Sequence, residues 1–142
     1  MDLHKLTEDL TVAAQVDPAE IPLLAAQGIR SIICNRPDGE VPGQAPFSTV
    51  EQAAAASGIK AVYLPVVSNA IGDADVTAFG KALEELPKPI LAYCRSGTRS
   101  AVLWSLSEAA GKRPIQDILS KAAQAGYDLS ALSPRLEKMQ RP

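Results

Sequence analysis

Short apolar runs alternate with helix-length segments along this chain, and that alternation limits the folds available to it. The runs at residues 31–35 and 90–93 are almost entirely apolar, which is typical of strands covered on both faces. Further strands are predicted at residues 10–16 and 60–64, and helical segments of about ten to fifteen residues separate the runs. This alternation predicts βαβ units, and therefore an α/β fold with a single, mostly parallel sheet of about four or five strands flanked by helices.

Capping and turn residues indicate where the helices begin and end. Asp17-Pro18 predicts an N-cap followed by a first-turn proline, for a helix that ends at Gly28. Ser48, with Glu51 three residues later, predicts a capping box for the next helix. Later helices are expected at residues 73–86, 100–110 and 114–126, and in a short segment from residue 133.

Length and charge narrow the functional classes. The chain has 142 residues, of which 46% are hydrophobic, and we expect one domain covering residues 1–142. Its net charge of −2 and lack of a basic stripe argue against nucleic acid and anionic membranes as partners. No apolar segment approaches the roughly 18 residues that a membrane span requires, so a soluble, cytoplasmic protein is expected. The two cysteines are expected to be reduced thiols.

Three connecting segments are predicted to meet at one edge of the sheet. They follow successive predicted strands, and the carboxyl ends of parallel strands lie together at the edge where such sheets bind ligands. The segments are Arg36–Glu40, Val66–Asp75 and Cys94–Ser100. The sequence therefore predicts the functional site at this edge.

The third segment, Cys94-Arg95-Ser96-Gly97-Thr98-Arg99-Ser100, has the composition of an anion-binding loop. It leads from a strand end into a helix, so backbone N–H groups and the positive end of the helix dipole converge on a small volume. That field, strengthened by the two arginines, favours the thiolate form of Cys94 and makes it a candidate nucleophile. The alternative is that Cys94 is only a small, buried core residue.

Other residues of this loop have predicted roles in holding an anion. Gly97 suits a position with positive φ or close backbone approach, and Arg99 can bind an oxyanion through two parallel hydrogen bonds. We expect Arg95, Ser96 and Thr98 to line the anion site as well. Ser100 is expected either to cap the helix or to donate a hydrogen bond to the sulfur.

The second cysteine, Cys34, is predicted to be a core residue. It follows Ile32 and Ile33 on a strand that is expected to be buried. Its place near the same edge of the sheet leaves a minor role as a resolving thiol open.

The segments Ile32–Glu40 and Pro89–Ser100, with the early strand at Leu10–Gln15, resemble a bacterial family of phosphatase-like domains. Such domains occur alone, in beta-lactamase-hydrolase-like proteins, or fused to metallo-β-lactamase-like persulfide dioxygenases and flavin disulfide reductases. The resemblance covers most of the chain, and Pro89–Ser100 is its most specific stretch. It implies a fold like that of dual-specificity phosphatases, with a persulfide dioxygenase or flavin reductase as a partner.

The loop differs in length from that of the phosphatases it resembles. Dual-specificity and tyrosine phosphatases have five residues between the cysteine and the arginine, whereas Cys94 and Arg99 enclose four. This spacing is similar to the Cys-x-x-Gly-x-Arg loop of single-domain rhodaneses, which accepts a cysteine persulfide and small sulfur oxyanions. The resemblance therefore implies a phosphatase-like fold that carries a rhodanese-like loop.

A general acid would separate the two chemistries, because an alkoxide or phenoxide leaving phosphorus needs a proton and a sulfite leaving sulfur needs much less help. Asp73 and Asp75 lie in the region where related phosphatases hold their acid, although helix N-capping is the favoured interpretation of both. Asp38 is a further candidate and is more typical of a turn residue. Arg36 either lines the pocket or lies on the surface.

Three functions follow from these residues. The first is sulfurtransfer, in which Cys94 takes a sulfur from thiosulfate or glutathione persulfide and passes it to an acceptor thiol. The alternative is a tyrosine- or dual-specificity-type phosphatase that acts through a cysteinyl-phosphate, with Arg99 on the phosphoryl oxygens. The third is a non-catalytic module that senses anions or persulfides. No metal or organic cofactor is expected, and His4 should be solvated at a frayed N-terminus.

Overall fold

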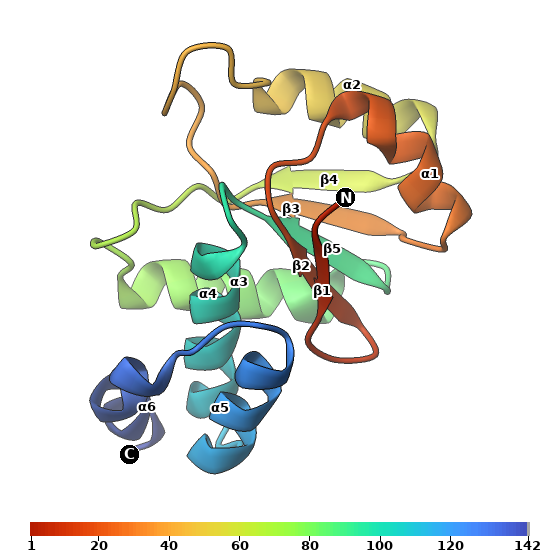
Figure 1. Ribbon diagram of the computed structural model, residues 1–142. Coiled ribbons are helices and arrows are strands. Elements are labelled where there is room, and N and C mark those ends of the chain that lie inside the picture. The colour runs from red at the N-terminus through yellow and green to blue at the C-terminus, as the bar shows by residue number, and fades with distance from the viewer. Residues whose placement is uncertain (142) are drawn as a thin grey trace.

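A five-stranded sheet forms the centre of the computed structural model, which describes residues 1–141 (Figure 1). The strands lie in the order β1-β2-β5-β3-β4; β1 is antiparallel to β2, and the other neighbours are parallel. The strands are β1 (Leu3–Lys5), β2 (Leu10–Ala13), β3 (Ser31–Cys34), β4 (Lys60–Tyr63) and β5 (Ile90–Tyr93). This sheet confirms the predicted α/β class.

In the described part of the chain, six α-helices and two short 3₁₀ helices connect and cover the strands. The α-helices are α1 (Ile21–Ala26), α2 (Phe47–Ala56), α3 (Asp73–Glu85), α4 (Thr98–Ala110), α5 (Ile115–Gln124) and α6 (Ser133–Gln140). The 3₁₀ helices are Pro18–Glu20 and Ser130–Leu132. Within residues 1–141, no helix has the length and apolar character needed to cross a membrane.

The two faces of the sheet carry separate hydrophobic clusters, because successive side chains of a strand point to opposite faces. Ile33 of β3 and Ala92 of β5 are paired in register and pack on the side of α3 and α4. Ile32 and Leu91, one residue earlier in each strand, pack with Leu24 of α1 and other residues of α1 and α2. Figure 1 shows these helix pairs on opposite faces, with α5 and α6 packed outside α4. The near-continuous apolar runs follow from this burial on both sides.

The helix starts predicted at Asp73 and Ser133 agree with the structure, whereas α4 begins at Thr98, two residues before the predicted start, and α2 begins at Phe47. Asp17 accepts a hydrogen bond from the Ala19 N–H at 2.9 Å and forms a capping box with Glu20. The capping box expected at Ser48 does not form, because α2 already begins at Phe47. The Phe47 N–H donates instead to Asp38 Oδ1, at 2.8 Å, so a carboxylate nine residues earlier in the loop between β3 and α2 satisfies one N–H of the first turn.

The N-terminus is ordered into a strand that sequence reasoning missed. His4 lies in β1 opposite Val12 of β2, and 30% of its side chain is exposed. Its Nε2 lies 2.6 Å from Asp2 Oδ1, and its ring meets that of Tyr127 edge-on at 5.3 Å between centroids. The expectation of a frayed, solvated His4 is therefore wrong.

The central strands should dominate the stability of the fold. Leu91→Ala removes a side chain with 0% exposure, and we expect it to lower the free energy of unfolding by about 2–5 kcal/mol. Leu23→Ala is the matched control, since Leu23 is 53% exposed and its loss should change that free energy by about 0.5 kcal/mol or less. Urea unfolding of both variants tests this, and equal losses would contradict the assignment of the core.

Candidate active site

The three segments predicted to meet at one edge of the sheet are in contact. Arg99, in the first turn of α4, donates from Nη1 to Glu40 of the loop after β3, at 2.7 Å, and to the Val66 carbonyl after β4, at 3.0 Å. Cys94 directly follows β5, which lies beside β3 in the sheet. The structure thus confirms the predicted convergence of these segments.

Cys94 lies against the N-terminus of a helix. The Gly97 N–H donates to Cys94 Sγ at 3.1 Å, and Gly97 is the N-cap of α4. Gly97 has a φ of +93°, as the sequence predicts for this position. The positive end of the helix dipole therefore faces the thiol. Cys94 itself is 1% exposed.

The end of β2 supports the start of this loop. The Cys94 N–H donates to the Ala13 carbonyl, and the Gln15 N–H donates to the Arg95 carbonyl, each at 3.3 Å. The parallel pairing of β2 with β5 thus continues one step beyond the strand ends. This support holds the backbone at Cys94 in place.

Glu40 holds Arg99 with two hydrogen bonds, from Nη1 at 2.7 Å and from Nη2 at 2.9 Å. The side chain of Arg99 is 8% exposed and that of Glu40 is 26% exposed. The Arg99 hydrogen bond is the main reason that the pKa of Glu40 falls to about 2. In turn, the hydrogen bond with Glu40 raises the pKa of Arg99, and the nearby charge of Cys94 adds to that rise.

This arrangement leaves part of Arg99 available to a substrate. Three of its five guanidinium N–H groups donate to Glu40 and to the Val66 carbonyl. Two N–H groups are not used by these partners, and Arg99 is also close enough to Cys94 for the two side chains to interact. Two such groups suffice for a bidentate contact with an oxyanion. Glu40 was not predicted as a site residue, although it stands at the end of the predicted segment Arg36–Glu40.

Arg36 belongs to the same network and is not a surface residue. It is 4% exposed, and its Nε donates to Glu40 Oε1 at 2.9 Å. Its Nη1 donates to Gln15 Oε1 at 3.0 Å. Of the two alternatives for Arg36, the structure supports the buried position at the site.

The remaining loop residues divide into exposed and buried ones. Arg95, Ser96 and Thr98 are exposed, and the hydroxyls of the latter two lie 3.0 Å apart. Ser100 is fully buried, and its hydroxyl donates to Asn35 Oδ1 at 2.8 Å. Ser100 therefore neither caps α4 nor donates to the sulfur, contrary to expectation, because a side chain at the end of β3 takes its hydrogen bond.

The three candidate acids all have structural partners. Asp75 Oδ2 accepts from the Gly72 N–H at 2.9 Å and so caps α3. Asp73, with 84% of its side chain exposed, lies 3.6 Å from Arg135, and Asp38 accepts from Phe47. The capping interpretation is confirmed for Asp75, whereas Asp73 stands in the first turn of α3 and pairs with Arg135 instead of capping the helix. The acid role stays a prediction.

Cys34 has the surroundings expected of a core residue. It is 2% exposed, and its thiol donates to the Arg36 carbonyl at 3.3 Å. Burial raises the pKa of this thiol, which is the opposite of what a reactive cysteine needs. Both cysteines are free thiols.

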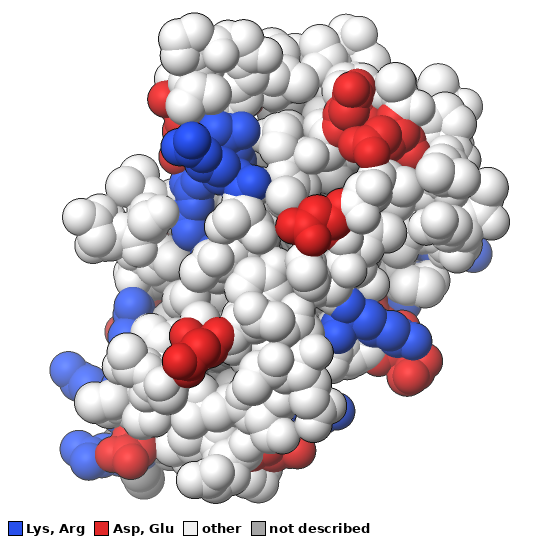
Figure 2. All heavy atoms as spheres, viewed as in Figure 1, with Lys and Arg blue, Asp and Glu red and all other residues white. Residues whose placement is uncertain are grey.

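Other features of the surface lie apart from the loop. Figure 2 shows basic and acidic residues as small separate groups on the face it presents, with no basic stripe there.

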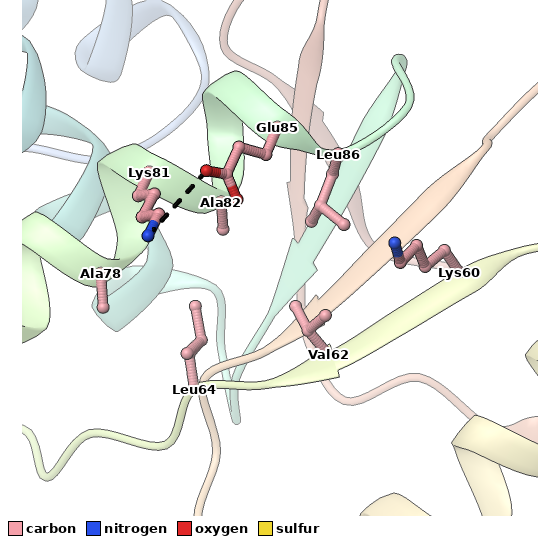
Figure 3. Close-up of a pocket in the computed structure, with 8 residues that line it drawn as sticks. All are labelled: Lys60, Val62, Leu64, Ala78, Lys81, Ala82, Glu85 and Leu86. Carbon is pink, nitrogen blue, oxygen red and sulfur yellow. Dashed lines mark ion pairs between the residues drawn. The ribbon is translucent and has the colours of Figure 1, made fainter.

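A cavity of about 290 Å³ lies between α3 and β4 (Figure 3) and is lined by Lys60, Val62, Leu64, Ala78, Lys81, Ala82, Glu85 and Leu86. No residue of the Cys94 loop lines it. Among residues 1–141, no three His, Cys, Asp or Glu side chains gather as a metal site would require.

The Glu40 network should make the fold sensitive to acid. Because the pKa of Glu40 falls from 4.5 to about 2, its carboxylate stabilises the fold above about pH 4.5, and this contribution is lost as the pH falls toward 2. Glu40→Gln should therefore lower the free energy of unfolding at neutral pH. The gap in free energy of unfolding between this variant and the wild type should shrink in acid. Urea unfolding near pH 7 and pH 3 measures this. Glu51→Gln, at an exposed position of α2, is the control, and a difference that does not depend on pH would contradict the prediction.

Comparison with known proteins places these residues in a family. The sequence profile of the family described as "Beta-lactamase hydrolase-like protein, phosphatase-like domain" matches residues 2–111. A beta-lactamase hydrolase-like protein of Agrobacterium fabrum is 39% identical over 139 residues, which cover 97% of this chain and 32% of that protein. A protein of the same name from Xylella fastidiosa is 36% identical over 140 residues, again 97% of this chain and 32% of the relative. The chain thus spans about a third of the length of these relatives.

Solved structures of similar proteins bear on both fold and function. A candidate phosphatase from Neisseria meningitidis is 35% identical, with a TM-score of 0.88 and coverage of 98% of this chain and 99% of that one. The core catalytic domain of the PP-IP phosphatase SIW14 from S. cerevisiae, at 17% identity and a TM-score of 0.69, shares the fold and covers 99% of this chain and 86% of its own. These similarities confirm the phosphatase-like fold, and they favour the phosphatase hypothesis over sulfurtransfer. The chain belongs to the family of phosphatase-like domains of beta-lactamase hydrolase-like proteins.

Proposed function

We propose that this chain hydrolyses phosphate monoesters, with Cys94 as the nucleophile. The observation that carries the proposal is the position of Cys94 Sγ, which accepts the Gly97 N–H at 3.1 Å at the N-terminus of α4, the helix whose first turn carries Arg99. Similarity to phosphatase-like proteins, which covers 98% of the chain in the Neisseria meningitidis structure, supports the same chemistry.

The reaction has two steps. The Cys94 thiolate attacks phosphorus, the bond from phosphorus to the ester oxygen breaks, and the leaving phenoxide or alkoxide takes a proton from water as a cysteinyl-phosphate forms. Water then attacks phosphorus, the S–P bond breaks, and inorganic phosphate and the thiolate are released. The free N–H groups of Arg99 and the backbone N–H groups of the loop bind the non-bridging oxygens, where charge builds up in both steps.

Cys94→Ser should abolish turnover while Cys34→Ala keeps it. Cys94 is the proposed nucleophile, so its loss should lower the rate of aryl phosphate hydrolysis roughly a thousandfold or more. Cys34 is the matched control, because it is a buried free thiol at the end of the adjacent strand. Mass spectrometry of the quenched wild-type reaction should find the phosphoryl group on Cys94. Equal activity of the two variants would reject the nucleophile.

The leaving group should limit which esters react. Asp38, Asp73 and Asp75 are held by capping contacts or exposed to water, so none stands as a positioned acid. We therefore expect aryl phosphates, whose phenoxides leave readily, to react much faster than alkyl phosphates. Steady-state rates across esters of graded leaving-group acidity measure this dependence. Similar rates for aryl and alkyl esters would mean that an acid acts, and the three Asp→Asn variants would then identify it.

Sulfurtransfer is a second candidate, and the spacing of the loop favours it. Cys94 and Arg99 enclose four residues, one fewer than in the phosphatases that the loop resembles. In this reaction Cys94 attacks the outer sulfur of thiosulfate, the S–S bond breaks, and sulfite leaves as an anion that needs no proton. The Cys94 persulfide then passes its outer sulfur to an acceptor thiolate, such as that of glutathione, and the Cys94 thiolate is restored.

One preparation can be assayed for both chemistries. The phosphatase proposal predicts aryl phosphate turnover and no persulfide on Cys94 after incubation with thiosulfate or glutathione persulfide. A Cys94 persulfide that transfers to a thiol, without phosphate release, would replace the first proposal with the second. Anion binding without turnover of any substrate would reject both and support a sensing module.

A further inference from the structure

Tyr127 touches the Cys94 loop from a segment far along the chain. It lies between α5 and the 3₁₀ helix at Ser130–Leu132, and its hydroxyl donates to the Ser96 carbonyl at 3.2 Å. We propose that Tyr127 is a positioning residue that orients the Ser96–Gly97 peptide toward Cys94. This inference rests on Cys94 being the nucleophile, whichever substrate it attacks.

The argument starts from the two ends of one peptide group. The Ser96 carbonyl and the Gly97 N–H belong to the same planar unit, and in a trans peptide they point in opposite directions. Tyr127 donates to the carbonyl, while the N–H donates to Cys94 Sγ at 3.1 Å. The tyrosine therefore fixes the rotation of the peptide that supplies the donor to the sulfur. Hydrogen bonds in such a chain also polarise one another.

The tyrosine also packs against the glycine itself. A Cβ atom placed on Gly97 would lie 2.2 Å from the Tyr127 hydroxyl oxygen and 3.1 Å from its Cζ. Any side chain at this position would displace the tyrosine or the loop. Gly97 is thus required for its positive φ and also for the close approach of Tyr127.

Tyr127 is itself held as a protonated donor. It is 9% exposed, and burial is the main reason that its pKa rises to about 12. Its ring meets the His4 ring edge-on, and His4 is in turn hydrogen bonded to Asp2. The N-terminal strand β1 therefore packs against the Tyr127 ring and helps to hold it in place. Tyr127 lies beyond the family match at residues 2–111, so the segment between α5 and the 3₁₀ helix at Ser130–Leu132 also contacts the loop.

The test compares Tyr127→Phe with Ser31→Ala. The first removes the hydroxyl and keeps the ring. The second also removes a hydroxyl that donates to a backbone carbonyl, from Ser31 to Pro87 at 2.7 Å, but at the amino end of β3, opposite the site. Both variants should lower the midpoint of urea unfolding slightly and by similar amounts. Only Tyr127→Phe removes a contact to the Cys94 loop.

The first readout is the rate at which iodoacetamide alkylates Cys94 near neutral pH, which peptide mass mapping measures. The second is the concentration of inorganic phosphate that protects Cys94 by half. For Tyr127→Phe we expect both the alkylation rate and the phosphate affinity to fall about 3- to 10-fold, the effect of one lost hydrogen bond. For Ser31→Ala neither should change.

Two outcomes would overturn the inference. One is wild-type alkylation and protection in Tyr127→Phe, and the other is an equal loss in Ser31→Ala, which would mean that general stability is responsible. Neither readout requires turnover, so the inference can fail while phosphate hydrolysis is found, or hold when it is not. A double variant gives an independent check, because Tyr127→Phe should relieve part of the damage caused by Gly97→Ala, and fully additive effects would also count against the proposal.

Discussion

One carboxylate, that of Glu40, allows this fold to bury two arginines at its reactive edge. Arg36 comes from the end of β3 and Arg99 from the first turn of α4, and both donate to Glu40. A buried guanidinium without a partner is strongly destabilising, so neither side chain could occupy its place alone. The same contacts draw the loop after β3 onto α4 and leave two N–H groups of Arg99 for a substrate. The geometry of the site therefore depends on this ion-pair network.

The geometry of the candidate site suits a small oxyanion next to a thiol. Donors come from the backbone at the start of α4 and from Arg99, and Glu40 orients Arg99 without competing for all of its N–H groups. Such an arrangement stabilises charge on oxygen whether the central atom is phosphorus or sulfur. The two proposed reactions differ instead in what leaves. A phenoxide or alkoxide benefits from an acid and a sulfite does not, and Asp38 and Asp75 are occupied with capping contacts.

Local signals predicted much of the fold and failed where distant residues intervene. The strands and most helices were found because burial on both faces leaves apolar runs, and caps leave polar residues at fixed places. The helix start expected at Ser48 was wrong because Asp38, nine residues before Phe47 in the loop that leads into α2, binds the first N–H of the helix. β1 was missed because a three-residue strand at the sheet edge carries too short a pattern to detect. Tyr127 had no local signal, since nothing near it in sequence indicates the loop that it touches.

By itself, the sequence determined the α/β class, the edge at which the site lies, and the loop from Cys94 to Ser100. Each of these depends on periodicity or on residues that are neighbours in the sequence, and both can be recognised without a structure. Only the tertiary structure decided that Glu40 holds Arg99 across 59 residues, that Ser100 binds Asn35 across 65, and that Tyr127 binds Ser96 across 31. Side-chain hydrogen bonds between residues so far apart follow no repeat in the sequence, and they exist only once the sheet has brought its loops together.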